Sequence, residues 1–218
     1  MNQTKERPIL FSAPMVRAIL SGQKTVTRRV VKPQYCEGPW FVKPALESHH
    51  AGHSHDWWLP TGPQPYAALP KCPYGRPGDR LWVREAWQAD AQVNAIAPRE
   101  LSHGEPIQYP ADGSSRQIGC SMITPGKTRP PIHMPRWVSR ILLEITDARV
   151  ERLQDISRSD IRAEGLECPP ELAQEDALPN YRDWYPAAWR DLWETINGAD
   201  SWSSNPWVWV VEFKRMTP

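Results

Sequence analysis

The segment GQKTVTRR, residues 22 to 29, gathers the side chains of this sequence that are best suited to act on a polar ligand. Lys24 and Thr27 lie three positions apart at a predicted transition from helix to strand, where a turn can bring an ammonium close to a hydroxyl. A threonine hydroxyl is a poor nucleophile until a neighbouring base takes its proton, and a lysine whose pKa is lowered by burial is such a base. The segment therefore predicts a nucleophile site, a non-catalytic anion clamp or a solvated strand surface.

A carboxylate would complete a catalytic site by orienting the lysine or by moving a proton to the leaving group, but residue types alone single out no particular Glu. The sequence contains no G-x-S-x-G motif, Walker loop or Rossmann glycine fingerprint. The stretch HHAGHSHD supplies His49, His50, His53, His55 and Asp56, but its spacing matches no zinc pattern and favours a surface loop. We therefore expect neither a metal nor a cofactor.

Short elements at irregular spacing must position these residues. The patterns predict strands at 8–11, 25–31, 78–87, 134–153 and 206–215. They predict helices from Ser12 to Gly22, from Ser157 to Gly165 and over 185–198, the last with Ala188, Leu192 and Ile196 along its apolar face. This mixture indicates an α+β fold around a small, mostly antiparallel barrel.

Two long stretches, about 32–76 and 88–131, lack a regular pattern and are predicted to be insertions in a single domain spanning residues 1–218. The 24 prolines favour such irregular connections. The 12 tryptophans supply either core bulk or flat surfaces for base stacking, and the core is the expectation for any one of them.

Charge and composition narrow the class of protein. Lys and Arg number 26 against 25 Asp and Glu, so net charge gives no general argument for nucleic-acid binding. The four cysteines show no C-x-x-C spacing, which favours reduced thiols over a zinc ribbon or a disulfide framework. No signal-peptide pattern and no run of roughly 20 apolar residues is present. We expect a cytoplasmic protein with no membrane association and no obligate protein partner.

Five segments closely resemble the ASCH-domain family, in particular its phage and prophage members: RPILFSAPMVRAILSGQKTVTRR, YGRPGDRLWVREAW, MPRWVSRILLEITDARVERLQDIS, AEGL and NPWVWVVEFKR. The resemblance implies a PUA-like β-barrel with flanking helices, related to RNA-binding domains and to domains that read modified bases. It also implies that the segment around Lys24 lines a ligand cleft.

One branch of that family, the N4-acetylcytidine amidohydrolases, uses a lysine, a threonine and a glutamate. Its G-x-K-T-x-T motif is similar to the one here, so the resemblance implies Lys24 as base and Thr27 as nucleophile. By position in the helix after the central strand, Glu164 resembles the glutamate that shuttles the proton. This chain is longer than those enzymes and carries the two insertions.

Other family members are described as ribonucleases or as binders of RNA and modified nucleotides. On that hypothesis cations contact phosphates and aromatic rings stack on a base. The candidate rings are Trp82 and Trp137, for which a place in the core is the alternative. The candidate cations, for which a solvated surface is the alternative, are Arg28, Arg29, Arg84, Arg136 and Arg140.

Taken together, the residues and the resemblance predict an ASCH domain that recognises a nucleoside or an RNA base and hydrolyses the N4-acetyl amide of acetylcytidine. A metal-independent ribonuclease and a non-catalytic binding module are the alternatives. The predicted cleft is formed by Lys24, Thr27, Arg29, Arg84, Glu85 and Glu164.

Overall fold

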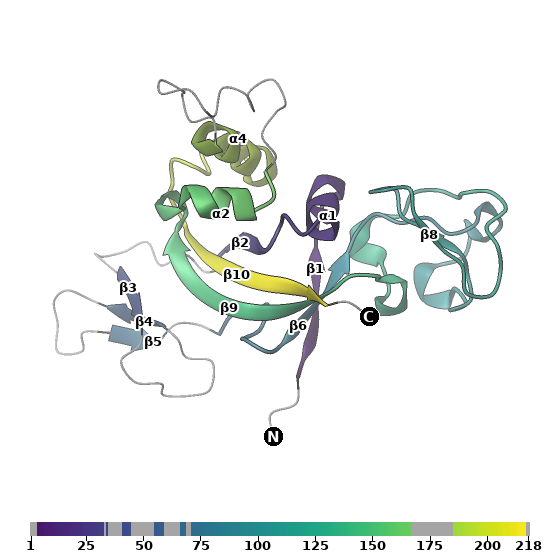
Figure 1. The fold of residues 1–218 in the computed structure, drawn as a ribbon, viewed down its shortest axis with the longest axis horizontal. Coiled ribbons are helices and arrows are strands. Elements are labelled where there is room, and N and C mark those ends of the chain that lie inside the picture. Colours follow the sequence, from purple (N-terminus) through teal and green to yellow (C-terminus); the bar gives the residue numbers. More distant parts are fainter. Residues whose placement is uncertain are drawn as a thin grey trace. The chain divides into compact units, whose positions relative to one another are not determined.

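The structure, a computed structural model, describes residues 4–32, 34, 41–44, 55–58, 66–68, 71–166 and 185–216, with backbone alone at 41–44, 55–58 and 66–68. Its longer elements are, in chain order, β1 (Glu6–Leu10), α1 (Ala13–Leu20), β2 (Val26–Val30), β3 (Phe41–Pro44), β4 (His55–Trp58), β5 (Tyr66–Ala68), β6 (Arg80–Arg84), β7 (Ile107–Gln108), β8 (Ser115–Arg116), β9 (Leu142–Arg152), α2 (Arg158–Ala163), α4 (Tyr185–Asn197) and β10 (Trp207–Met216) (Figure 1). Short 3-10 helices occupy Ala91–Val93, Pro98–Glu100, Pro131–His133, Arg136–Val138 and Leu153–Asp155. Among all these residues, no helix has the length and apolar character needed to cross a membrane.

Five strands form one mixed sheet in the order β1-β6-β9-β10-β2. Strand β1 runs parallel to β6, whereas β6 pairs antiparallel with β9 and β10 pairs antiparallel with β2. The α+β class is confirmed, but no pairing of the described strands closes this sheet into a barrel. The predicted insertion at 32–76 is not wholly irregular, because β3, β4 and β5 form a small antiparallel sheet within it.

The chain falls into two compact units. Unit 1 comprises Met1–Gly22, Gly78–Glu144 and Lys214–Pro218, and unit 2 comprises Gln23–Pro77 and Ile145–Phe213. Strands β9 and β10 therefore contribute residues to both units. The prediction of a single domain stays a prediction.

In unit 1 the helix α1 begins and ends where local chemistry predicts. Ser12 is its N-cap residue in an extended conformation, and Pro14 occupies the first turn, where its missing N–H costs no hydrogen bond. Gly22 follows with φ of 81°, a left-handed conformation that glycine adopts without strain. Val16, Ala18 and Ile19 are buried, so the predicted helix is confirmed.

The predicted insertion at 88–131 contributes to a core within unit 1. The buried members of this core are Trp87, Ala89, Leu101, Ile107, Tyr109, Met134 and Val138. Arg129 is also buried, and its two terminal nitrogens each donate to a carbonyl oxygen at 2.9 Å, those of Ile96 and Val93. The stretch therefore has little regular secondary structure, but part of it packs in the core of unit 1.

The strand predicted at 134–153 is wrong in its first part, since β9 begins only at Leu142. Pro135 precedes a 3-10 helix, and this helix, not the strand, carries Arg136 and Trp137. A proline supplies no N–H for strand pairing and its fixed φ suits the start of such a turn, which explains the later start of β9.

In unit 2 the helices α2 and α4 pack together (Figure 1) around an aromatic and aliphatic core. This core contains Val26, Leu153, Ile161, Tyr185, Trp189, Trp193, Val208 and Val210. The helix α4 exists where predicted, but its predicted apolar face is wrong at Ile196, which is 53% exposed, whereas Leu192 packs against this core. The large rings of Tyr185, Trp189 and Trp193 instead form its buried face, since they remove more apolar surface from water.

Candidate functional site

Strand β2 presents the predicted site residues on two different faces. It pairs with β10 so that Thr27 lies opposite Val211 and Arg29 opposite Trp209. Successive side chains of a strand point to opposite faces, so Thr27 and Arg29 share one face and Arg28 lies on the other. The flanking residues of that second face, Val26 and Val30, pack in the aromatic core of unit 2.

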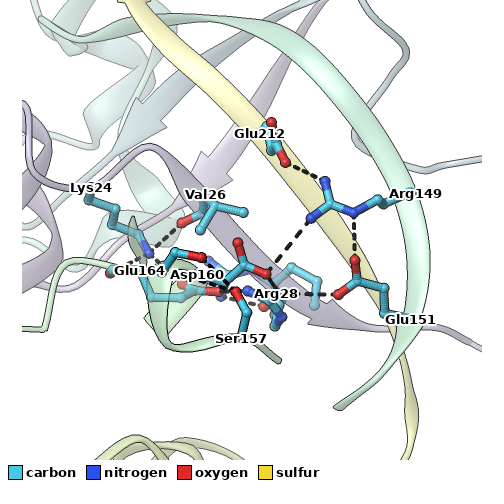
Figure 2. Close-up of polar contacts among 11 residues, drawn as sticks. Lys24, Val26, Arg28, Arg149, Glu151, Ser157, Asp160, Glu164 and Glu212 are labelled. Atoms are coloured by element: carbon cyan, nitrogen blue, oxygen red, sulfur yellow. Dashed lines mark hydrogen bonds and ion pairs between the residues drawn. The ribbon is translucent and has the colours of Figure 1, made fainter. Parts of the chain in front are cut away.

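Lys24 and Glu164 form a buried ion pair in unit 2 (Figure 2). Glu164 is the residue that follows α2, which Ser157 caps at its start and Gly165, with φ of 89°, ends. The Nζ atom of Lys24 lies 2.6 Å from Oε2 of Glu164, and the side chains are 0% and 2% exposed. The structure thus brings together the lysine and the glutamate that the sequence resemblance singled out.

Among the described residues, the ammonium of Lys24 donates to three acceptors. Besides the Glu164 carboxylate, Nζ donates to the backbone oxygens of Val26 and Glu164, each at 2.8 Å. Burial lowers the pKa of Lys24, and the attraction and hydrogen bond of Glu164 oppose that effect without outweighing it. The positive charges of Arg29 and Arg28 lower the pKa further. Lys24 is therefore a lysine from which a proton is more easily removed than usual.

Thr27 and Arg29 occupy the other face of β2. Thr27 is 1% exposed, and within the described part of the chain its hydroxyl takes part in no side-chain hydrogen bond. Arg29 hydrogen-bonds the hydroxyl of Tyr74, whose pKa is raised by burial even though the arginine opposes the shift. Tyr74 is the first residue of the segment YGRPGDRLWVREAW but was not a predicted site residue, because its proline-rich surroundings show no periodicity.

For Arg28 the two predictions were a contact with phosphate and a place on the solvated surface. Its burial contradicts the second prediction. Its side chain is 0% exposed and forms ion pairs with Glu151, Asp160 and Glu164 at 3.1, 2.9 and 3.4 Å. The alternation in VTRRV was the available signal, because Arg28 lies between two valines on one strand face. An arginine in that position must bring acidic partners into the core with it.

In unit 1, Glu85 is buried at 1% exposure and is fully engaged by Arg140. The Nε and Nη2 atoms of Arg140 bind the two carboxylate oxygens at 2.9 Å each, a bidentate arrangement. Nη1 of Arg140 also binds Asp112 at 2.8 Å, and the guanidinium lies 4.1 Å from the ring centroid of Tyr109. Both oxygens of Glu85 thus already have a strong donor.

The ion pair between Arg140 and Asp112 predicts a specific loss of stability in acid. Burial raises the pKa of Asp112, but hydrogen bonds from Arg140 and Ser114 outweigh it and lower this pKa from 3.8 to about 2. A carboxyl group whose pKa is lower in the folded than in the unfolded protein stabilises the fold at pH values above its unfolded-state pKa. This stabilisation disappears as the pH falls through its folded-state pKa. Between about pH 4 and about pH 2, wild type is therefore expected to lose more stability than Asp112→Asn. Urea unfolding at several pH values measures this, and parallel pH profiles would contradict it.

The two candidate stacking rings also lie in unit 1. Trp82 is 8% exposed, with the guanidinium carbons of Arg84 and Arg136 at 4.6 and 5.9 Å from its ring centroid. The half-buried Trp137 stacks on His103, with ring centroids 5.0 Å apart. Both tryptophans thus have ring or cation partners from the protein itself.

The arginines beside Trp82 have partners of their own. Arg84 donates to the carbonyl of Ile132 at 3.3 Å, and Arg136 donates to the carboxylate of Glu6 at 3.0 Å. Neither guanidinium is therefore held in place by the tryptophan ring alone.

The eleven candidate site residues fall into two groups. Unit 2 contains Lys24, Thr27, Arg28, Arg29 and Glu164, and unit 1 contains Trp82, Arg84, Glu85, Arg136, Trp137 and Arg140. No group of three or more His, Cys, Asp or Glu side chains that could hold a metal occurs among the described residues. The side chains of the histidine-rich stretch 49–56 lie outside the described residues.

No protein-family model, curated protein or solved structure matches this chain. The ASCH resemblance therefore rests on the sequence motifs, and the candidate site rests on the geometry of unit 2.

Proposed function

We propose that this chain is a PUA-like ASCH protein that recognises a nucleoside or an RNA base and hydrolyses the N4-acetyl amide of acetylcytidine at Lys24, Thr27 and Glu164. The observation that carries the proposal is the buried contact of 2.6 Å between Lys24 Nζ and Glu164 Oε2. A lysine with a lowered pKa, held by a carboxylate near a strand that carries a threonine, has the composition of an activated nucleophile site. Closure of the sheet as a PUA-like barrel and a cytoplasmic location belong to the same proposal.

The proposed reaction begins with proton movement within the ion pair. The three acceptors around Lys24 Nζ match the three N–H groups of an ammonium. In the proposed first step Nζ transfers one proton to Oε2 of Glu164. The neutral amine, which forms no hydrogen bond with Thr27 among the described residues, then turns from its carbonyl acceptors to the Thr27 hydroxyl and takes its proton. The lowered pKa of Lys24 favours this step.

The threonine oxygen then attacks the carbonyl carbon of the acetamide and forms a tetrahedral intermediate. The intermediate collapses as the C–N bond breaks, and the proton on Glu164 passes to the departing N4 amine, which releases cytidine. Water then hydrolyses the acetyl ester on Thr27 and yields acetic acid, which releases its proton to solvent, and the free hydroxyl.

A non-catalytic binding module is the second candidate, and one observation favours it. Because all three N–H groups of the Lys24 ammonium already have acceptors, the ion pair also suits a purely structural role between β2 and α2. In that case the positive charge of the ligand-binding face would come from Arg29, which shares its strand face with Thr27.

Hydrolysis of N4-acetylcytidine, followed as cytidine release, tests the proposal with Thr27→Val as the critical variant. Valine keeps the branched shape, and no side-chain hydrogen bond of Thr27 is lost among the described residues, so the free energy of unfolding is expected to stay within about 1 kcal/mol. We expect kcat to fall by about a thousandfold or more. Thr27→Ser, which keeps a hydroxyl, is expected to retain measurable turnover.

Wild-type turnover no greater than that of Thr27→Val would remove the amidohydrolase activity. Binding of cytidine analogues by such an inactive wild type would then support the binding module. Cleavage of an RNA ladder without added metal would instead support the ribonuclease.

A further inference from the structure

We infer that Arg28 is a positioning residue for the Lys24–Glu164 pair: it anchors the second oxygen of the Glu164 carboxylate, so that the first stays on Lys24. The catalytic role of Arg28 rests on the proposed function, but its effect on Lys24 and Glu164 can be measured even in a protein without activity. Arg28 touches no substrate in this account and acts through Glu164.

The two oxygens of Glu164 are divided between two cations (Figure 2). Oε2 lies 2.6 Å from Nζ of Lys24, and Oε1 lies 3.4 Å from Nη1 of Arg28. Rotation of the carboxylate would therefore weaken two contacts at once. A carboxylate fixed in this way keeps one oxygen directed at the lysine through successive proton transfers.

Arg28 does not depend on Glu164 for neutralisation. Its Nη2 atom binds Asp160 Oδ2 at 2.9 Å and Glu151 Oε2 at 3.1 Å, and both carboxylates are only about one-quarter exposed. Arg149, on β9, in turn binds Glu151 of the same strand and Glu212 of β10 (Figure 2). Because these groups balance the charge of Arg28, Glu164 makes its short contact with Lys24 and not with Arg28.

The charge of Arg28 also acts on the lysine. After burial, which has the largest effect, Arg29 and Arg28 both lower the pKa of Lys24, against the opposing influence of Glu164. Proton transfer from Nζ to Glu164, the first step of the proposed reaction, is thereby made easier. Loss of the guanidinium would hold the proton on the lysine.

Stability alone does not account for an arginine at this position. Val26 and Val30, its neighbours on the same strand face, pack in the apolar core of unit 2, where a third apolar side chain would fit the pattern. Replacement of a buried ion network by apolar residues is often neutral or stabilising. The presence of this network is therefore weak evidence that Arg28 serves to stabilise the fold. Orientation of the Glu164 carboxylate is a specific role for the positive charge of Arg28.

The test compares Arg28→Met with Arg149→Met, a matched control in the same network. Arg149 shares Glu151 and Asp160 with Arg28 but has no ion pair with Glu164 among the described side chains. NMR titration of the Lys24 Nζ resonance is expected to show a higher pKa in Arg28→Met than in wild type, and a pKa close to wild type in Arg149→Met. If wild type hydrolyses acetylcytidine, kcat is expected to fall about tenfold or more in Arg28→Met with KM unchanged, and less in the control.

An unchanged Lys24 pKa in Arg28→Met would overturn the inference whether or not any acetylcytidine is hydrolysed. Absence of hydrolysis by wild type, together with the expected change in pKa, would overturn the proposed function and leave the role of Arg28 standing.

If Arg28→Met does not fold, Arg28→Lys and Arg149→Lys replace the pair. Lysine keeps the charge but lacks the planar fork, so Glu164 is expected to be held less firmly. Hydrogen exchange of the Lys24 ammonium is then expected to be about fivefold faster in Arg28→Lys than in wild type, and unchanged in Arg149→Lys. Equal exchange rates in the two lysine variants would contradict the inference.

Discussion

Replacing Glu164 with glutamine is expected to lower the free energy of unfolding by about 3–5 kcal/mol, because it leaves a buried lysine without its counter-charge. Lys24 would keep its two carbonyl acceptors and lose the carboxylate 2.6 Å from Nζ. Arg28 would at the same time lose one of its three carboxylate partners. Denaturant unfolding of both proteins measures the difference, provided that the slope m is the same for both.

The matched control is Glu194→Gln in α4. Glu194 pairs with Arg190 at 3.5 Å on the helix surface, where the arginine side chain is 57% exposed. The same chemical change there is expected to cost less than about 0.5 kcal/mol. The double variant Lys24→Met, Glu164→Leu is expected to recover most of the stability lost in Glu164→Gln, because it removes both charges. Equally small losses in Glu164→Gln and Glu194→Gln would contradict the buried ion pair.

Replacing Trp189 with alanine is expected to destabilise the protein by about 3–5 kcal/mol. Trp189 is 4% exposed and lies in the centre of the buried face of α4, beside Trp193 at a ring-centroid distance of 5.9 Å. Truncation would leave a cavity that the neighbouring rings can fill only in part. Thermal and denaturant unfolding measure the loss.

Ile196→Ala is the control for this prediction, because the sequence pattern placed Ile196 on the apolar face whereas the structure leaves it 53% exposed. Its effect is expected to stay within about 0.5 kcal/mol. A larger loss in Ile196→Ala than in Trp189→Ala would mean that α4 is rotated relative to the arrangement described above.

The helix boundaries were predictable because they depend on local chemistry. The side chain of Ser157 caps α2, Pro14 fits the first turn of α1, and Gly22 and Gly165 end the two helices in the left-handed conformation, all through effects that act within a few residues. The buried face of α4 was not predictable in the same way. It depends on which side chains fill the space beside β2 and β10, and a count of apolar spacing does not weigh a tryptophan against an isoleucine.

The candidate site was predictable in part for a related reason. Lys24 and Glu164 were singled out by motif and by resemblance, although 140 positions separate them in the chain. Arg28 was a candidate for phosphate contact, but its burial was missed, because an arginine in a strand suggests a surface and its acidic partners lie far along the sequence, in β9 and α2. Burial of a charge depends on partners that no local pattern names.

Lys24 also satisfies part of the backbone of β2. In the order of paired strands β2 comes last, and it bonds to β10 through contacts such as Val31 N to Trp207 O and Thr25 O to Phe213 N. By strand alternation the carbonyls of residues 26 and 28 point away from β10. Lys24 Nζ occupies the first at 2.8 Å and Arg29 Nη1 approaches the second at 3.5 Å. The cations of the candidate site thus also satisfy backbone acceptors of β2 that β10 leaves unpaired, so a variant without Lys24 would leave a buried carbonyl without its donor and lose stability for that reason as well.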